Sequence, residues 1–450
     1  MNRSTRRALA AAGVVLAGVT ITQGSALAEA PPGLRQQAPH GVAIGTRLAA
    51  QTDPAVQLVQ TEYAARVTVP TASARTSFTA LFAKARQHAK AGRIPSDHQS
   101  QVKWVLRTAR SNVGRYFAPA GPARTVKVSS LGLCTGWWVT PQGHMVTAAH
   151  CVGATKAELR KTFAAQALPK INNGDVKGFL KQIMGIAQPD DELVRLATAV
   201  FTRFNTETMR VTGLRQSVGV AGALPGGGMD RSVKVTPVAL VARGRSYPGE
   251  DFALLKLAGA KNLPTVPLGD DVDVRVGDTL YINGFPGLVS ISTQIFDLRS
   301  RLYPALTEGA YNAKRTTVLG VPYIQAQAPS YRGNSGGPVL SQEGKVIGTL
   351  IAGSVDPATG ESAENHSFIL PVSIIKKRLA AAGVDASRSQ TSLVYNDALD
   401  DFFAQRFKAA LPKFRKAQRL YPQHPYVASY IGDTKRAITA GKDRTPKAKA

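Results

Sequence analysis

Cysteine and acidic residues are scarce in this sequence. Its 450 residues include only 2 cysteines, and 29 acidic residues stand against 56 lysines and arginines, a formal net charge of +27. So few cysteines exclude a disulfide-dense scaffold, and no Cys/His spacing suggests a metal site. No internal apolar run is long enough to span a membrane. We therefore expect no metal, no cofactor and no internal membrane span.

The longest apolar run lies at the N-terminus. Three arginines precede an apolar run over residues 8–20, and residues 26–28 read Ala-Leu-Ala. This pattern is typical of a secretory signal peptide, and both the general and the twin-arginine export routes fit it. An uncleaved membrane anchor is the alternative, although the run is short for a span. We expect residues 1–28 to be removed and the protein to be secreted.

The two cysteines are Cys134 and Cys151. In an exported chain an isolated pair is expected to form one disulfide, because the surroundings are oxidising. Two free buried thiols are the alternative.

The excess positive charge is spread along the chain rather than gathered in blocks. Such a surface suits an anionic cell-surface polymer or an acidic substrate, and a solvated basic surface without a dedicated partner fits equally well. No basic motif with interleaved aromatic residues is present, so we expect no specific nucleic-acid partner.

Hydrophobic periodicity divides the chain into β-rich and helical stretches. Residues 29–53 are rich in Pro, Gly and Gln and predict a flexible segment or short propeptide. Helical spacing appears over residues 77–113 and again within 155–204, between segments with strand patterns. Many short strands separated by Gly and Pro follow residue 206, which favours a β-barrel or sandwich. We interpret the two helical stretches as insertions into that β scaffold.

The C-terminal region is predicted to be helical again. Within residues 391–440, the aromatic and small residues are spaced as in the second helix of a tetratricopeptide repeat, which they resemble. Only about one and a half repeats are visible, whereas stable arrays need about three. We therefore expect these helices to pack against the β domain. They are a candidate surface for a protein partner. The basic tail, residues 441–450, is predicted to be disordered.

Three short motifs carry catalytic residue types. "VTAAHC" places His150 at the end of an apolar strand, "GEDFALLKL" places Asp251 before another strand, and "YRGNSGGP" contains Ser335. A serine hydroxyl needs a neighbouring base to become a nucleophile, and an imidazole of near-neutral pKa is suited to that role. A carboxylate on the other ring nitrogen sets the tautomer. Glu250 is the runner-up acid, one residue from Asp251.

The order His, Asp, Ser, with a cysteine pair around the histidine hairpin, resembles the trypsin-like serine peptidases. "LYINGFPG" and "HSFILPVSIIKKRL" resemble segments of the bacterial HtrA-type branch. The resemblance covers residues 54–383 and implies two six-stranded antiparallel β-barrels in a mainly β protein. It also implies a His150–Asp251–Ser335 triad and an oxyanion hole made by the amides of Gly333 and Ser335. No PDZ-like segment follows, and HtrA-type enzymes usually lack the cysteine pair.

Two further positions bear on activation and specificity. Residue 334 is Asn, where zymogen-activated trypsins have an aspartate that pairs with a freed N-terminus, so we expect no such activation. Residue 329 is Pro, where trypsin itself has its substrate-binding aspartate, so a preference for small or apolar side chains is expected. The function predicted is a secreted serine endopeptidase acting on protein or peptide substrates. The alternative is a latent or inactive peptidase-fold protein that recruits partners.

Overall fold

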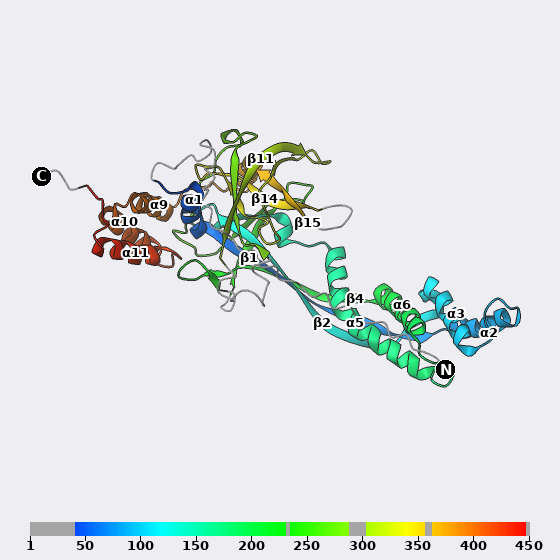
Figure 1. Ribbon diagram of the computed structural model, residues 1–450. Helices are drawn as coiled ribbons and strands as arrows, with labels where there is room; N and C mark the ends of the chain where they lie inside the picture. The colour runs from blue at the N-terminus through cyan, green and yellow to red at the C-terminus, as the bar shows by residue number, and fades with distance from the viewer. Residues whose placement is uncertain (1–40, 231–234, 288–302, 356–361, 447–450) are drawn as a thin grey trace, which may run out of the picture.

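The computed structural model describes residues 41–230, 235–287, 303–355 and 362–446. It has three parts: a β-rich body, a long arm that projects from it, and a group of C-terminal helices on the opposite side (Figure 1). The predicted signal peptide and the last four residues of the tail lie outside the described residues. No helix among those described combines the length and apolarity needed to cross a bilayer.

The arm is an extension of the first sheet of the body. Two strands that pair antiparallel over almost their whole length, β1 (Val56–Ala74) and β2 (Phe117–Trp138), leave the body together, and β4 (Arg210–Val220) pairs with β1 along the way. Successive β1 side chains alternate between buried and exposed, as expected when one sheet face is covered. The sheet order is β7-β4-β1-β2-β3-β9-β8. Its shorter strands are β3 (His144–Thr147), β7 (Thr236–Pro237), β8 (Ala239–Arg243) and β9 (Ala253–Lys256).

Helices cover one face of the arm and form its far end. The long helix α5 (Lys156–Gln182) lies along the ribbon and buries Phe163 against Val67 and Val69 of β1. The far end has its own apolar core, which is separate from that of the body. It is built from α2 (Thr76–Lys90), α3 (His98–Ser111), α4 (Val113–Tyr116) and α6 (Asp191–Thr208).

The second half of the body is a closed antiparallel barrel. Its strands follow the order β10-β11-β12-β15-β14-β13, and a compact aliphatic core fills it. Helix α8 (Val372–Ala381) follows the last strand and packs on the body through Ile375 and Leu379. The strands are β10 (Thr279–Gly284), β11 (Ala305–Thr316), β12 (Pro322–Ala326), β13 (Pro338–Leu340), β14 (Val346–Val355) and β15 (Ser362–Pro371).

The C-terminal helices dock on the body through the N-terminal helix. Helices α9 (Gln390–Phe403), α10 (Phe407–Leu420) and α11 (Val427–Thr439) share an aromatic core. Helix α1 (Ile44–Thr52) adds Ala50 to that core while its Leu48 is buried in the body. Hydrogen bonds from the Thr265 amide to Ser392 Oγ and from Gly226 to the Pro425 carbonyl complete the contact.

Three predictions need correction. The first sheet is open rather than a second closed barrel, because β1 and β2 continue past the body and pair with β4 along the arm. The protein is a mixed α/β structure rather than mainly β, since helices build the end of the arm and the C-terminal group. The segment 29–53 is not flexible throughout: residues 44–52 form α1, whose apolar side is buried between the body and α9.

Candidate active site

His150 and Asp251 meet because two neighbouring strands pair antiparallel. Thr147 at the end of β3 lies opposite Ala253 at the start of β9, so residues after one strand and before the other share an edge of the sheet. His150 sits on a short 3-10 turn there, and its Nδ1 lies 2.8 Å from Asp251 Oδ2. The His150 amide donates to Asp251 Oδ1 at 2.9 Å. Both carboxylate oxygens therefore hold the histidine.

Asp251 is fully buried, and its ionised carboxylate is stabilised by hydrogen-bond donors. Burial alone favours the neutral acid and raises the pKa of Asp251. Hydrogen bonds from the His150 ring and the Tyr247 amide, together with the charge on His150, have the larger effect and hold the pKa below its usual value. The Tyr323 hydroxyl donates to the Gly249 carbonyl at 2.6 Å and braces the loop. An ionised Asp251 at neutral pH can fix the His150 tautomer with Nε2 free to accept a proton.

Ser335 lies on a turn that only glycine permits on both sides. Gly333 and Gly336 have φ of +103° and +86°, and a Cβ on Gly333 would lie 2.4 Å from the Phe285 carbonyl oxygen. The carbonyls of the turn accept hydrogen bonds from elsewhere in the body. Among the described residues, none accepts a hydrogen bond from the amides of Gly333 and Ser335. Both N–H groups are thus available to an anionic oxygen.

The structure brings the serine turn against the histidine turn. Cys151 Sγ lies 3.7 Å from His150 Nε2 and 3.5 Å from the Ser335 carbonyl oxygen. The Ser335 hydroxyl donates to the Ile351 carbonyl at 3.2 Å, and no hydrogen bond joins it to His150 in the described part of the chain. The His–Asp pair is thus formed, while the serine side chain is turned aside.

The cysteine pair is bonded. Cys134 and Cys151 form a disulfide that ties β2 to the turn carrying His150. Their sulfurs and the His150 ring are the one close group of potential metal donors among the described residues. Because the sulfurs are bonded to each other, they offer no thiolate to a metal.

Comparison with known proteins agrees with this geometry. Residues 134–348 match the family model of the trypsin-like peptidase domain. The matched segment is slightly under half of the chain and is similar to that domain. A probable periplasmic serine endoprotease, DegP-like, of Pseudomonas putida strain F1 is 38% identical over 104 residues, 22% of this chain and 19% of that protein. The mitochondrial serine protease HTRA2 of Bos taurus is 34% identical over 106 residues, again 22% of this chain and 21% of that protein.

These relatives share only part of their length with the chain. The aligned segment spans about a fifth of each curated relative. Among solved structures, the HtrA-type protease AlgW with decapeptide is 17% identical and overlaps 75% of this chain and 67% of its own, with a TM-score of 0.36. A TM-score this low does not assign the fold.

Other residues of the peptidase domain take up different roles. The runner-up acid Glu250 pairs with Arg378 Nε of α8 at 2.6 Å. Asn334 is buried against Gly284, and its Oδ1 has no hydrogen-bond partner among the described residues. The Pro329 carbonyl accepts a hydrogen bond from Thr307. The motifs point to none of these contacts, since each partner is distant in sequence.

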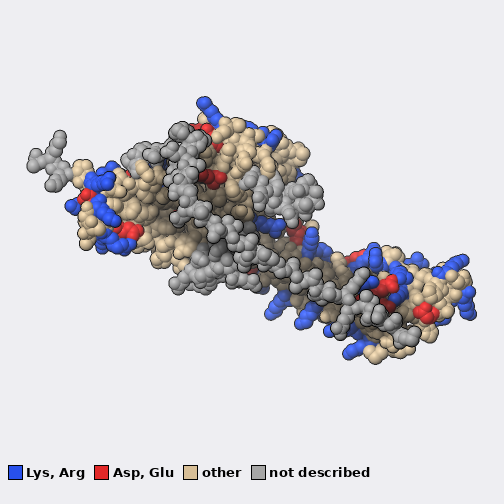
Figure 2. Space-filling model, viewed as in Figure 1, with Lys and Arg blue, Asp and Glu red and all other residues tan. Residues whose placement is uncertain are grey.

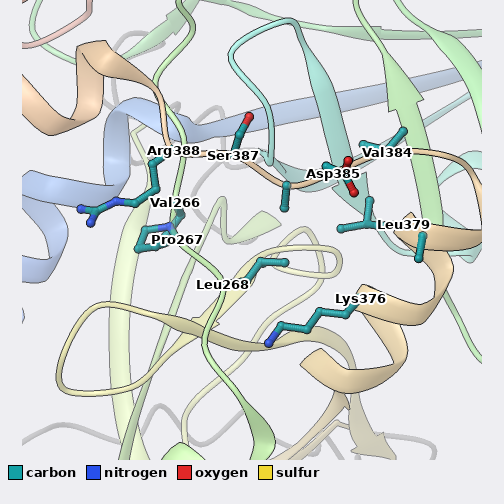
Figure 3. A pocket seen from close by; sticks show the side chains of 11 residues that line it. Val266, Pro267, Leu268, Lys376, Leu379, Val384, Asp385, Ser387 and Arg388 are labelled. Carbon is teal, nitrogen blue, oxygen red and sulfur yellow. The ribbon is translucent and has the colours of Figure 1, made fainter.

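A cavity lies outside the candidate active site, where the peptidase domain meets the segment leading to the C-terminal helices. It has a volume of about 410 Å³ and lies between α8 and residues 384–388 (Figure 3). Apolar side chains such as Val266 and Leu379 line it together with Lys376 and Arg388. Lys376 is paired with Asp270. No group with a role in the His–Asp–Ser arrangement reaches this cavity.

Proposed function

We propose that the chain is an exported serine endopeptidase that hydrolyses peptide bonds of protein or peptide substrates. The observation that carries the proposal is the hydrogen-bonded His150–Asp251 pair beside a glycine turn in which the amides of Gly333 and Ser335 have no acceptor within the described part of the chain. The match of residues 134–348 to a trypsin-like peptidase domain supports the same reaction.

In the proposed reaction Ser335 Oγ attacks the substrate carbonyl and passes its proton to His150 Nε2. The imidazolium is stabilised by Asp251, and the tetrahedral oxyanion accepts hydrogen bonds from the Gly333 and Ser335 amides. His150 then protonates the leaving amine. Water repeats the sequence on the acyl-enzyme and releases the acid product. Each oxyanion donor is worth about 2.7–4 kcal/mol of barrier.

Catalysis requires Ser335 to turn from the Ile351 carbonyl towards His150. We infer that a χ1 rotation between staggered positions makes this change. The His150 side chain is 38% exposed, so a substrate can approach Nε2 from solvent. We infer that substrate binding favours the rotated serine.

Active-site labelling tests the proposal against the alternative of a partner-recruiting protein without catalysis. A fluorophosphonate probe should form an adduct with the wild type and none with Ser335→Ala. Ser129→Ala, a serine on the arm strand β2, is the control and should label normally. Absence of an adduct from wild type at every pH from 5 to 9 would overturn the endopeptidase and favour the binding protein.

The specificity proposal is a preference for small or apolar side chains before the cleaved bond. Pro329 and its neighbours in "AQAPSYRG" offer no acid to pair with a basic substrate side chain. Cleavage of a mixed peptide library should show this preference, and dominant cleavage after Arg or Lys would contradict it.

Activation is proposed not to need a freed N-terminus. Asn334 is an amide, and its buried position offers no carboxylate to an incoming ammonium. Removing residues 29–43, which leaves α1 in place, should therefore leave activity within about 2-fold. A variant that becomes active only on cleavage, with its new N-terminus buried, would refute this proposal.

We propose the arm as the surface for an anionic cell-surface polymer. Residues 61–130 and 155–215 hold 22 lysines and arginines against 8 acidic residues. Figure 2 shows blue side chains along the visible face of the arm. Several acids are already paired, among them Asp190 and Glu192 with Lys103. On α2, Lys84, Arg86 and Lys90 are exposed and outside these pairs.

Binding to immobilised heparin, a soluble stand-in for such a polymer, tests the arm. Reversing Lys84, Arg86 and Lys90 to Glu should lower the salt concentration needed for elution. The control reverses three exposed basic residues of α10: Lys408, Arg415 and Lys416. If both variants elute alike, the positive charge acts as a whole and the arm is no dedicated surface.

The remaining proposals concern export and domain organisation. We infer that residues 1–28 direct export, so a mature protein starting at Glu29 should be recovered from the medium. The peptidase domain is assigned to residues 54–383, with insertions at 77–113 and 155–204. Residues 391–440 are proposed as a tetratricopeptide-like region that offers α10 to a protein partner, since α9 is covered by α1. A pull-down with and without residues 391–440 tests that partner.

A further inference from the structure

Thr135 has a buried hydroxyl at the point where the two halves of the body meet. It follows Cys134 near the end of β2 and is fully buried beside Trp137. A buried hydroxyl costs free energy unless its hydrogen bonds are made. Thr135 makes them all, and three of its four polar contacts reach the other half of the body.

The contacts of Thr135 converge on the serine turn. Its Oγ1 donates to the Gly333 carbonyl at 2.8 Å and accepts from the Phe285 amide at 2.9 Å. Its own amide donates to the Ser335 carbonyl at 2.9 Å, and its carbonyl accepts from Thr147 Oγ1. One residue of the first sheet thus holds the carbonyls on both sides of Asn334.

Holding these carbonyls fixes where the neighbouring amides point. The carbonyls of Arg332 and Asn334 accept from the backbone amides of Gly287 and Gly337, so each peptide plane of the turn is fixed by a hydrogen bond. At the Gly333 carbonyl the donor is a side chain. Gly333 itself offers little resistance to backbone rotation, because glycine populates many backbone conformations. Without the Thr135 hydroxyl, the peptide between residues 333 and 334 would keep only the hydrogen bond from the Asn334 amide to the Tyr331 carbonyl, at 3.0 Å.

We propose that Thr135 is a positioning residue for the oxyanion hole. Its hydroxyl holds the Gly333–Asn334 peptide, which joins the two peptides that carry the Gly333 and Ser335 amides, and so helps these amides to converge on one point. The inference rests on the proposed function, because those amides matter only if an oxyanion forms there. Thr135 touches no substrate, and it acts through the turn alone.

The test compares Thr135→Val, which keeps the shape and removes the hydroxyl, with Thr135→Ser, which keeps the hydroxyl. Removing an oxyanion donor outright costs about 10²–10³ in kcat. Displacing one is expected to lower kcat roughly 10- to 100-fold on a peptide substrate that wild type cleaves, with KM within about 3-fold. A peptide aldehyde, which forms a tetrahedral adduct, should bind Thr135→Val more weakly by the same factor. Thr135→Ser should restore both values to within about 3-fold of wild type.

A matched control separates positioning from stability. Thr391 is equally buried and donates its hydroxyl to the Asn262 carbonyl at 2.8 Å, between the C-terminal helices and the body. Thr391→Val should lower the melting temperature about as much as Thr135→Val and leave kcat unchanged. If Thr135→Val retains wild-type kcat and aldehyde affinity, or Thr391→Val loses as much, Thr135 has only a structural role.

Failure of the underlying function would look different. If wild-type protein neither labels with fluorophosphonate nor cleaves any substrate, the proposed endopeptidase fails, and Thr135 with it. If wild type labels and Thr135→Val labels at the same rate, only the role of Thr135 is overturned.

Discussion

The strand pair β1 and β2 runs through both the body and the arm and has a different role in each. In the body, β2 pairs with β1 and carries Cys134 of the disulfide and Thr135, which contacts the serine turn. In the arm, their other halves form a ribbon that α5 covers on one side, with a separate apolar core at its end. The 14 arm residues of β1, 61–74, at about 3.3 Å each place that end roughly 46 Å away. The continuous strands β1 and β2 thus connect the candidate active site, which must be rigid, with the distant end of the arm.

This comparison predicts that chemistry depends on the body alone. Asp251→Asn should lower kcat about 10⁴-fold, because a neutral amide no longer fixes the required His150 tautomer. Helical content from the arm should stay unchanged in circular dichroism. Glu250→Gln is the control, one residue away and paired with Arg378, and it should keep kcat within a few-fold. Equal losses in both variants would mean that the wrong acid has been assigned.

A core change at the arm end should have the reverse effect. Phe204 is 1% exposed and its ring packs edge-on against Phe117. Phe204→Ala should destabilise the arm end by about 3–5 kcal/mol. Because the two cores are separate, fluorophosphonate labelling of Ser335 should keep its wild-type rate at 25 °C. Parallel loss of labelling and arm structure on heating would instead show that body and arm unfold as one cooperative unit.

Breaking the disulfide should weaken the body more than the arm. Cys134 and Cys151 are 17 residues apart, and closing a loop of that size stabilises a fold by about 3 kcal/mol. The double change to Ala should lower the urea midpoint of the body transition. Hydrogen exchange in α2 and α3 should be unaffected. Exchange that quickens equally in both regions would place the disulfide's effect on the whole chain.

The smallest expected effect is a pH dependence of opposite sign in the two regions. In the arm, hydrogen bonds from Lys103 and the Leu193 amide lower the pKa of Asp190 to about 2. At the contact between α1 and the C-terminal helices, burial raises the pKa of Asp53 to about 7, against hydrogen bonds from Asn283 and Tyr426 that lower it. An acid whose pKa is lowered by folding stabilises the folded state above pH 4, and this stabilisation is lost as the pH falls towards 2. An acid whose pKa is raised by folding stabilises the folded state below pH 4, and this stabilisation is lost as the pH rises through 7.

The C-terminal helices should therefore dock more weakly at pH 8 than at pH 5. The protection factors of the α11 amides, which are exchange rates corrected for the intrinsic rate at each pH, should fall over that range in wild type and stay constant in Asp53→Asn. Asp97→Asn, at an exposed helix cap of the arm, is the control and should leave the response of α11 unchanged. Equal protection factors in wild-type α11 at both pH values would show that Asp53 does not titrate there.

Much of the local structure could be predicted because local patterns carry it. Helical spacing in residues 77–113 corresponds to α2 and α3, and the alternating segment after residue 55 corresponds to β1. The short helix α1 was missed, since nine residues without a side-chain cap resemble a loop in sequence. The open first sheet was missed because periodicity reports which face is buried and says nothing of the partner strand.

The sequence by itself determined the chemical groups and their order: a histidine, an aspartate, a serine between glycines, and one cysteine pair. Tertiary structure decided which of them touch and what surrounds them. Only the fold brings Thr135 to Gly333, 198 residues away, and turns Glu250 towards Arg378. Motifs record residues that chemistry requires at fixed spacing. Burial, hydrogen-bond partners and pKa values depend on atoms from distant segments, which meet only when the chain is folded.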